Sequence, residues 1–308
     1  MSQTYLLTPD NAALSRHPVA ATNKATTISG KDALAGAAGG VVSVLLGQPF
    51  DLIKVRLQTS DSGNVWQVVK GIWLHEGPLA FYKGAALPFL GVGASVSIQF
   101  MTFHSLRQYF ERQQHSQRAS TGQNYLSGGA AGIANSIISG PVEHIRTRLQ
   151  LQPHGVARLY SGPSDCVRQI FAKAGVAGIF KAYPTTVLRE FQAYGFYFAA
   201  FEASLGSIAS LKGKERKDIA VWETIPCGAL AGIAFWIGSY PIDAVKTRLQ
   251  SDGFGADARY RTTWAVVKEI WQYGGFRGFW RGLAPTLVRT SLSSAGCFAV
   301  IEHLRKLM

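Results

Sequence analysis

The chain has 308 residues, and its 31 lysines and arginines outnumber its 18 aspartates and glutamates to give a formal net charge of +13. Hydrophobic residues make up 47% and charged residues only 16%. Intrinsic disorder is therefore excluded, because there is ample apolar mass to bury. Three widely separated cysteines exclude a disulfide scaffold and lack the spacing of a zinc site.

The first 30 residues are rich in Ser, Thr and Ala and carry a few basic residues. They lack the continuous apolar core of a secretory signal, although they weakly resemble an organelle-targeting leader. We expect residues 1–30 to form a disordered N-terminal tail.

Long stretches without strong charges follow this tail. Each is close to the roughly 20 residues that cross a bilayer. Four contain no Asp, Glu, Lys or Arg, and two more are interrupted by one or two such residues: 33–50, 84–103, 119–142 and 224–242, then 182–201 and 282–301. The sequence therefore predicts six transmembrane helices, and the mean hydropathy of only +0.09 indicates that they line a polar interior.

One motif occurs three times along the chain. It reads Pro-x-acid-x-x-base-x-Arg-Leu-Gln and begins at Pro49, Pro141 and Pro241. An aromatic-base-small-residue element follows each motif, after an amphipathic stretch at 66–75, 164–173 and 263–273. The pattern predicts an all-α membrane protein of three repeats, each with a helix, a short surface helix and a second helix. The repeats span residues 31–118, 119–217 and 218–308.

These motifs, in register in all three repeats, resemble the mitochondrial carrier family across residues 31–308. The resemblance implies six transmembrane helices in three pseudo-symmetric repeats, with three short amphipathic helices on the matrix side. It also implies a multi-pass solute transporter of the mitochondrial inner membrane that works by alternating access.

The repeated motif is similar to the matrix gate of that family. Its acid and base lie three residues apart on one helix face. The prolines are expected to kink their helices and close the matrix end of a cavity. We expect each acid to pair with the base of the next repeat, and the final glutamines to brace the pairs: Asp51–Arg146, Glu143–Lys246 and Asp243–Lys54, with Gln58, Gln150 and Gln250. The alternative is three separate pairs within single helices, each worth a few tenths of a kcal/mol.

The opposite, cytoplasmic gate of the family is less regular in this sequence. Its acid position holds His104, Glu202 and Glu302, and its base position holds Arg107, Leu205 and Arg305. If each acid again pairs with the base of the next repeat, the two positions that lack a charge, His104 and Leu205, fall in the same pair. We therefore expect two bridges, Glu202–Arg305 and Glu302–Arg107.

Ionisable residues within spans are costly and mark function by default. Outside the gates these are Arg189, Glu190 and Arg289, while the first repeat has Gly91 at the position of the two arginines. Such asymmetry suits a substrate with an anionic and a cationic end. We expect Arg289 and Arg189 to bind a carboxylate and Glu190 to bind an ammonium or guanidinium group.

Two further interpretations concern this site. Trp236 could present a cation–π face to the substrate. Alternatively, Arg189 and Glu190 neutralise each other, which we consider disfavoured because adjacent helical side chains point about 100° apart.

The Arg189-Glu190 pair, with residues 90–93 and 240–243, resembles the branch of carnitine and basic amino acid carriers. Arg-Glu, where carnitine carriers typically have Arg-Asp, favours a basic or neutral amino acid such as ornithine, arginine or lysine. A carnitine or acylcarnitine carrier, a carboxylate carrier and a proton leak remain alternatives.

Other functional classes receive little support. The sequence has no Ser/His/Asp constellation and no phosphate-binding loop, so we expect no enzyme, catalytic residue, metal site or cofactor. Its basic residues gather at span ends without a recognition helix, so we expect no nucleic-acid partner. We expect anionic lipid, including cardiolipin, as a partner and a functional monomer.

Overall fold

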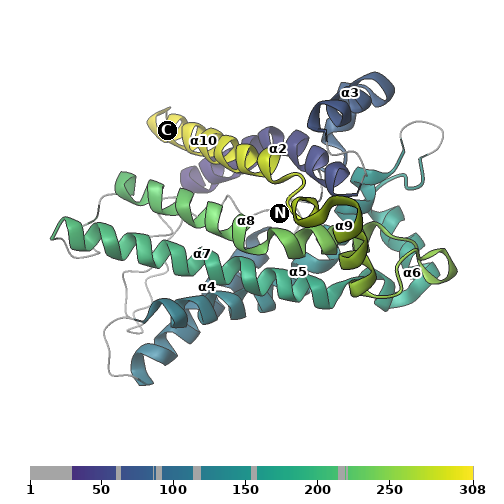
Figure 1. Cartoon of the computed structure of the whole chain (residues 1–308). Coiled ribbons are helices and arrows are strands. Elements are labelled where there is room, and N and C mark those ends of the chain that lie inside the picture. Colours follow the sequence, from purple (N-terminus) through teal and green to yellow (C-terminus); the bar gives the residue numbers. More distant parts are fainter. Residues whose placement is uncertain are drawn as a thin grey trace.

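The computed structural model describes residues 30–59, 64–85, 87, 92–113, 119–153, 158–213, 219 and 221–307. The predicted tail, apart from Gly30, and Gly91 lie outside these residues. Six long helices correspond to the six predicted spans (Figure 1): α2 (Gly30–Thr59), α4 (Val92–Gln113), α5 (Thr121–Leu151), α7 (Tyr183–Leu211), α8 (Val221–Ser251) and α10 (Leu283–Leu307). The second of them is described from Val92, within the predicted span 84–103.

Three shorter helices coincide with the predicted amphipathic stretches: α3 (Val65–Glu76), α6 (Pro163–Ile179) and α9 (Thr263–Gly278). They gather at one end of the helical bundle (Figure 1). Two short 3-10 turns flank these helices at different points of the repeat: η2 (Pro78–Tyr82) follows α3, and η6 (Gly255–Asp257) precedes α9. The end that carries α3, α6 and α9 is called the matrix end below.

A repeated glycine shapes each of these surface elements. Gly77, Gly175 and Gly275 have φ angles of 78°, 61° and 54°. L side chains rarely adopt such positive values, whereas glycine adopts them without a steric penalty. This requirement explains why glycine recurs at this point in all three repeats, although its neighbours differ.

The long helices pack mainly against their neighbours in sequence, and the first of them packs against the last. The helix pairs α5–α7, α2–α10, α7–α8 and α4–α5 make the main contacts, and α2 and α10 run side by side (Figure 1). Gly132 allows the closest approach within the α5–α7 pair, because a Cβ atom there would lie 2.3 Å from the carbonyl oxygen of Glu190. Small residues permit such approach between membrane helices.

Two helical segments in the described part of the chain, 38–59 and 223–251, are long and apolar enough to cross a membrane by length and composition. Other long helices carry buried charges, as α7 does with Arg189 and Glu190. The interior is also aromatic in part. Tyr194 and Phe198 of α7 pack there with Phe235 and Trp236 of α8.

Candidate functional site

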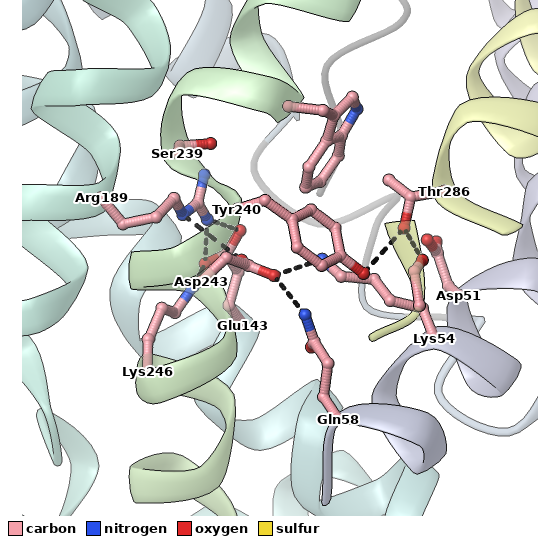
Figure 2. Close-up of polar contacts among 12 residues, drawn as sticks. Asp51, Lys54, Gln58, Glu143, Arg189, Ser239, Tyr240, Asp243, Lys246 and Thr286 are labelled. Carbon is pink, nitrogen blue, oxygen red and sulfur yellow. Dashed lines mark hydrogen bonds and ion pairs between the residues drawn. The ribbon is translucent and has the colours of Figure 1, made fainter. Parts of the chain in front are cut away.

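Each repeated proline lies inside a continuous helix, with the acid and base that follow it on the next turn. Pro49 lies in α2, Pro141 in α5 and Pro241 in α8. The C-terminal parts of these three helices place their charged side chains together in the interior (Figure 2). The six acid and base side chains are all buried.

The structure brings together the three predicted inter-repeat pairs. Asp51 Oδ2 lies 2.7 Å from Arg146 Nη2, and Asp243 Oδ2 lies 2.6 Å from Lys54 Nζ. Glu143 receives the ammonium of Lys246. Every acid therefore reaches the next repeat, which contradicts the alternative of separate pairs within single helices.

The three predicted glutamine braces differ from one another. Gln58 Nε2 donates to Asp243 Oδ2 over 3.0 Å, as Figure 2 shows. Gln250 instead approaches Thr186 Oγ1 at 3.4 Å. The side-chain amide of Gln150 makes no hydrogen bond within the described residues. Of the three, Gln58 has the geometry of a brace, and the sequence, which is identical at these positions, gives no sign of this difference.

Arg189 lies against the acids of the matrix end rather than apart from them. Its Nη2 donates to both carboxylate oxygens of Glu143, at 2.6 and 2.7 Å. Its Nε lies 3.7 Å from Asp243 Oδ1. The guanidinium thus joins two repeats in the same network as the predicted gate (Figure 2).

Arg289 makes the equivalent contact in the third repeat. Its Nε lies 3.1 Å from Asp51 Oδ1. Arg189 of α7 and Arg289 of α10 each reach the acid of the following repeat. In both contacts the arginine Nε faces the aspartate Oδ1. Asp51 is therefore shared between Arg146 and Arg289, just as Asp243 is shared between Lys54 and Arg189. Arg189 additionally contacts Glu143 of its own repeat, which also pairs with Lys246.

Glu190 is buried beside this network. Its Oε1 accepts from the Ser139 hydroxyl at 2.9 Å and lies 3.2 Å from Arg189 Nη2. The two adjacent side chains thus contact each other, although we considered such a pair disfavoured, because the long arginine side chain reaches back to its neighbour. Its Oε2 makes no hydrogen bond within the described residues.

Trp236 presents its ring to cations of the protein itself. Lys54 Nζ lies 4.3 Å from the ring centroid and the Arg289 guanidinium carbon lies 5.7 Å from it. The indole N–H donates to Thr290 Oγ1 at 3.1 Å. The predicted cation–π face therefore exists, and in this conformation Lys54 covers it.

The opposite end of the bundle contains one described bridge between repeats. Arg107 Nη1 lies 2.8 Å from Glu202 Oε1, and Arg107 Nε pairs with Glu111 one turn further on. This pair joins the second repeat to the first and was not predicted, whereas the predicted pairs Glu202–Arg305 and Glu302–Arg107 each involve a side chain outside the described residues and stay predictions. The side chains of Glu302 and Arg305 lie outside the described residues.

Several polar side chains of the site were missed from the sequence. Gln48 accepts a hydrogen bond from Arg146, Ser139 binds Glu190, and the Tyr240 hydroxyl donates to the carbonyl of Arg281 at 3.1 Å. All three lie one or two residues before a repeated proline. Their position next to the motif is the signal that could have found them.

The aromatic-base element connects neighbouring repeats at the matrix end. Lys83 Nζ donates to the carbonyl of Gln152 at 3.0 Å, and Lys181 Nζ donates to that of Asp252 at 2.7 Å. Burial lowers the pKa of Lys181 to about 8, against the opposing effect of Asp252. Burial alone would raise the pKa of Glu76, but hydrogen bonds from Arg56 and Lys83 hold it below its ordinary value.

Comparison with known proteins identifies this architecture. The family model described as "Mitochondrial carrier protein" matches residues 27–114, 117–209 and 217–308. The chain belongs to the mitochondrial carrier family. Its six long helices are accordingly the six spans of the carrier fold, and it is a multi-pass protein of the mitochondrial inner membrane.

Individual carriers are similar to this chain over most of their length. The "Glutamate/glycine mitochondrial carrier ymc1" of Schizosaccharomyces pombe is 44% identical over 91% of this chain and 96% of that carrier. The "Mitochondrial glycine transporter YMC1" of Saccharomyces cerevisiae is 37% identical, with 90% and 91% covered. The human "Mitochondrial basic amino acids transporter" is 36% identical, with 88% of each chain covered.

Proposed function

We propose that this carrier exchanges an amino acid across the mitochondrial inner membrane, and that Arg189, Glu190 and Arg289 bind it. The observation that carries the proposal is the burial of these three charges, which the first repeat lacks. A buried charge without a counterpart in each repeat is not required by the threefold symmetry of the gate or of the fold, and a buried charge in a span marks function by default. The relatives named for glycine, glutamate and basic amino acids support the same class of substrate.

The substrate's two ends fit the charges of this set. The α-carboxylate would bind Arg289, whose guanidinium can donate two parallel hydrogen bonds to a carboxylate. The α-ammonium would bind Glu190, whose Oε2 has no donor within the described residues. Carnitine is not favoured, since the relatives described above are named for amino acids.

The contacts of the two arginines also support a mechanism for coupling. Arg289 lies on Asp51, and Arg189 lies on Glu143 and Asp243. A substrate carboxylate that binds Arg289 would compete with Asp51 for the same guanidinium. Binding would therefore weaken the contacts that close the matrix end, and the free energy of substrate binding would offset the cost of opening it.

We propose a functional monomer with lipid as its other partner. Charges from α2, α5, α7, α8 and α10 of a single chain form the site. Exposed tryptophans on α3 and α9 suit the interface between lipid and water: Trp66, Trp73, Trp264 and Trp271. Basic residues beside them would attract anionic lipid such as cardiolipin.

Exchange in liposomes tests the proposal. Purified protein is reconstituted with internal glycine, lysine, ornithine, carnitine or a dicarboxylate, and uptake of the labelled compound is measured. We expect amino acid exchange, and its loss by at least about 100-fold in Glu190→Gln and Arg289→Gln, because each change removes a charged contact of the substrate. Asp257→Asn, which changes an exposed acid of η6 away from these contacts, is the control and should keep its activity.

Three results would contradict the proposal. One is exchange of carnitine or dicarboxylates without amino acids, and another is a proton current without exchange. The third is unchanged amino acid exchange in Glu190→Gln and Arg289→Gln alike.

A further inference from the structure

Three fully buried side chains at or near the proposed substrate site carry polar atoms without hydrogen bonds within the described residues. They are Glu190 through its Oε2, Tyr194 through its hydroxyl, and Asn135 through both amide atoms. The relative exposure of each residue is 0%. Buried polar atoms are nearly always paired, because leaving one unpaired costs about 1–3 kcal/mol. Several such atoms in one region indicate a ligand that provides the missing partners.

The helix pair α5–α7 places these side chains beside one another. Ala131, Asn135 and Ser139 lie four residues apart on one face of α5. Ala131 packs in the aromatic cluster that contains Tyr194, while Ser139 donates to Glu190 Oε1. Asn135 therefore lies between the levels at which α5 meets Tyr194 and Glu190.

Close packing fixes this arrangement. Gly132 of α5 contacts both Glu190 and Tyr194, because a Cβ atom there would lie 2.3 Å from the Glu190 carbonyl oxygen and 3.0 Å from Tyr194 Cδ2. The Tyr194 ring also packs edge-on against Phe235 of α8, with 5.5 Å between ring centroids. The hydroxyl is thus held in the interior, on the same side of α7 as Glu190, one turn away.

Neither Asn135 nor Tyr194 is repeated along the chain. Asn135 lies six residues before Pro141, and Tyr194 lies thirteen residues after Lys181. At the position of Asn135, the first repeat has Ser43 and the third has Phe235. At the position of Tyr194, the first repeat has Val96 and the third has Ser294. This asymmetry is shared with Glu190 and contrasts with the repeated acids and bases of the matrix end.

We propose that Asn135 and Tyr194 complete, with Glu190, a pocket for the primary ammonium group of the carried amino acid. An ammonium has three N–H donors, and the pocket has three acceptors without a donor: Glu190 Oε2, Asn135 Oδ1 and the Tyr194 hydroxyl oxygen. The inference rests on the proposed function and adds two residues and a selection rule to it. A quaternary ammonium has no N–H group and would leave all three acceptors unpaired.

Substrate isomers test the selection rule without changing the protein. Alanine and N-methylglycine contain the same atoms, but N-methylglycine has one N–H donor fewer. In wild-type liposomes we expect alanine to be exchanged at least about tenfold faster than N-methylglycine, and trimethylglycine at least about 100-fold more slowly than glycine. Equal rates for alanine and N-methylglycine would overturn the inference.

Two variants test the residues. Asn135→Ala and Tyr194→Phe should each raise the KM for glycine about tenfold and reduce the preference for alanine over N-methylglycine. Tyr197→Phe removes a hydroxyl one turn along the same helix and is the matched control. Unchanged KM and unchanged preference in both variants would overturn the inference, whereas a wild-type protein that exchanges no amino acid would overturn the proposed function itself.

Discussion

The two ends of the bundle hold their charges in different environments. At the matrix end the side chains of the three pairs are at most 7% exposed. At the opposite end, in the bridge between repeats that the structure describes, the side chain of Arg107 is 19% exposed and that of Glu202 is 9% exposed. Removing one partner of a buried pair costs about 3–5 kcal/mol, whereas exposed pairs contribute about 0–1 kcal/mol. In this conformation buried ion pairs therefore close the matrix end, and we expect its opening to require help from the substrate.

The largest effect is expected from Asp51→Asn. This change leaves the buried cations of Arg146 and Arg289 without their shared carboxylate, so we expect a loss of about 3–5 kcal/mol of unfolding free energy and no measurable exchange. Thermal unfolding in detergent and liposome exchange measure both. If Asp51→Asn lowered Tm no more than Glu202→Gln, the contrast between the two ends would be wrong.

A smaller effect distinguishes the glutamines within the matrix end. Gln58→Ala removes a hydrogen bond to Asp243 and should cost about 1 kcal/mol. Gln150→Ala removes an amide without a hydrogen bond within the described residues, so its Tm should fall less. Comparing the two melting curves tests this order. Equal losses would show that the identical motifs act identically.

The bridge at the cytoplasmic end should contribute less still. Arg107→Gln should cost no more than about 1 kcal/mol, because water screens the partly exposed pair. The difference in Tm between wild type and variant should shrink at high salt. A cost that is large and independent of salt would instead place this bridge in the same class as the matrix pairs.

The smallest effect concerns pH at the rim of the matrix end. The pKa of Glu76 is lowered from its ordinary value of 4.5, so its contribution to stability is present above that value and is lost as the pH falls through the lowered pKa. We expect wild type to lose its advantage over Glu76→Gln as the pH is lowered from 6 to 3. A difference in Tm that did not change with pH would contradict this assignment.

The repeats made most of the fold predictable from the sequence. Pro49, Pro141 and Pro241 aligned the three units, and threefold symmetry then predicted which acid meets which base. Symmetry could not predict where the repeats differ. Arg189 and Arg289 were expected to be separate from the gate. Their side chains are long enough to reach gate acids on other helices, Glu143 and Asp51.

Details that depend on side-chain conformation also escaped sequence reasoning. Gln58 and Gln150 occupy identical motifs, and only packing decides that the first reaches a carboxylate. The contact between Arg189 and Glu190 depends on how the guanidinium curves back along α7. The contact between Arg107 and Glu202 joins α4 to α7, and no repeated motif of the sequence indicates it.

The central claim is that Arg189 and Arg289 couple substrate binding to the matrix gate. Spin labels at cysteines replacing Lys70 and Lys268, exposed and equivalent positions on α3 and α9, report the opening of this end when Cys166, Cys227 and Cys297 are changed to serine. Electron paramagnetic resonance should show that adding an exchanged amino acid lengthens the distance between labels in the otherwise wild-type protein but not in Arg289→Gln. The same lengthening in both proteins would contradict the account.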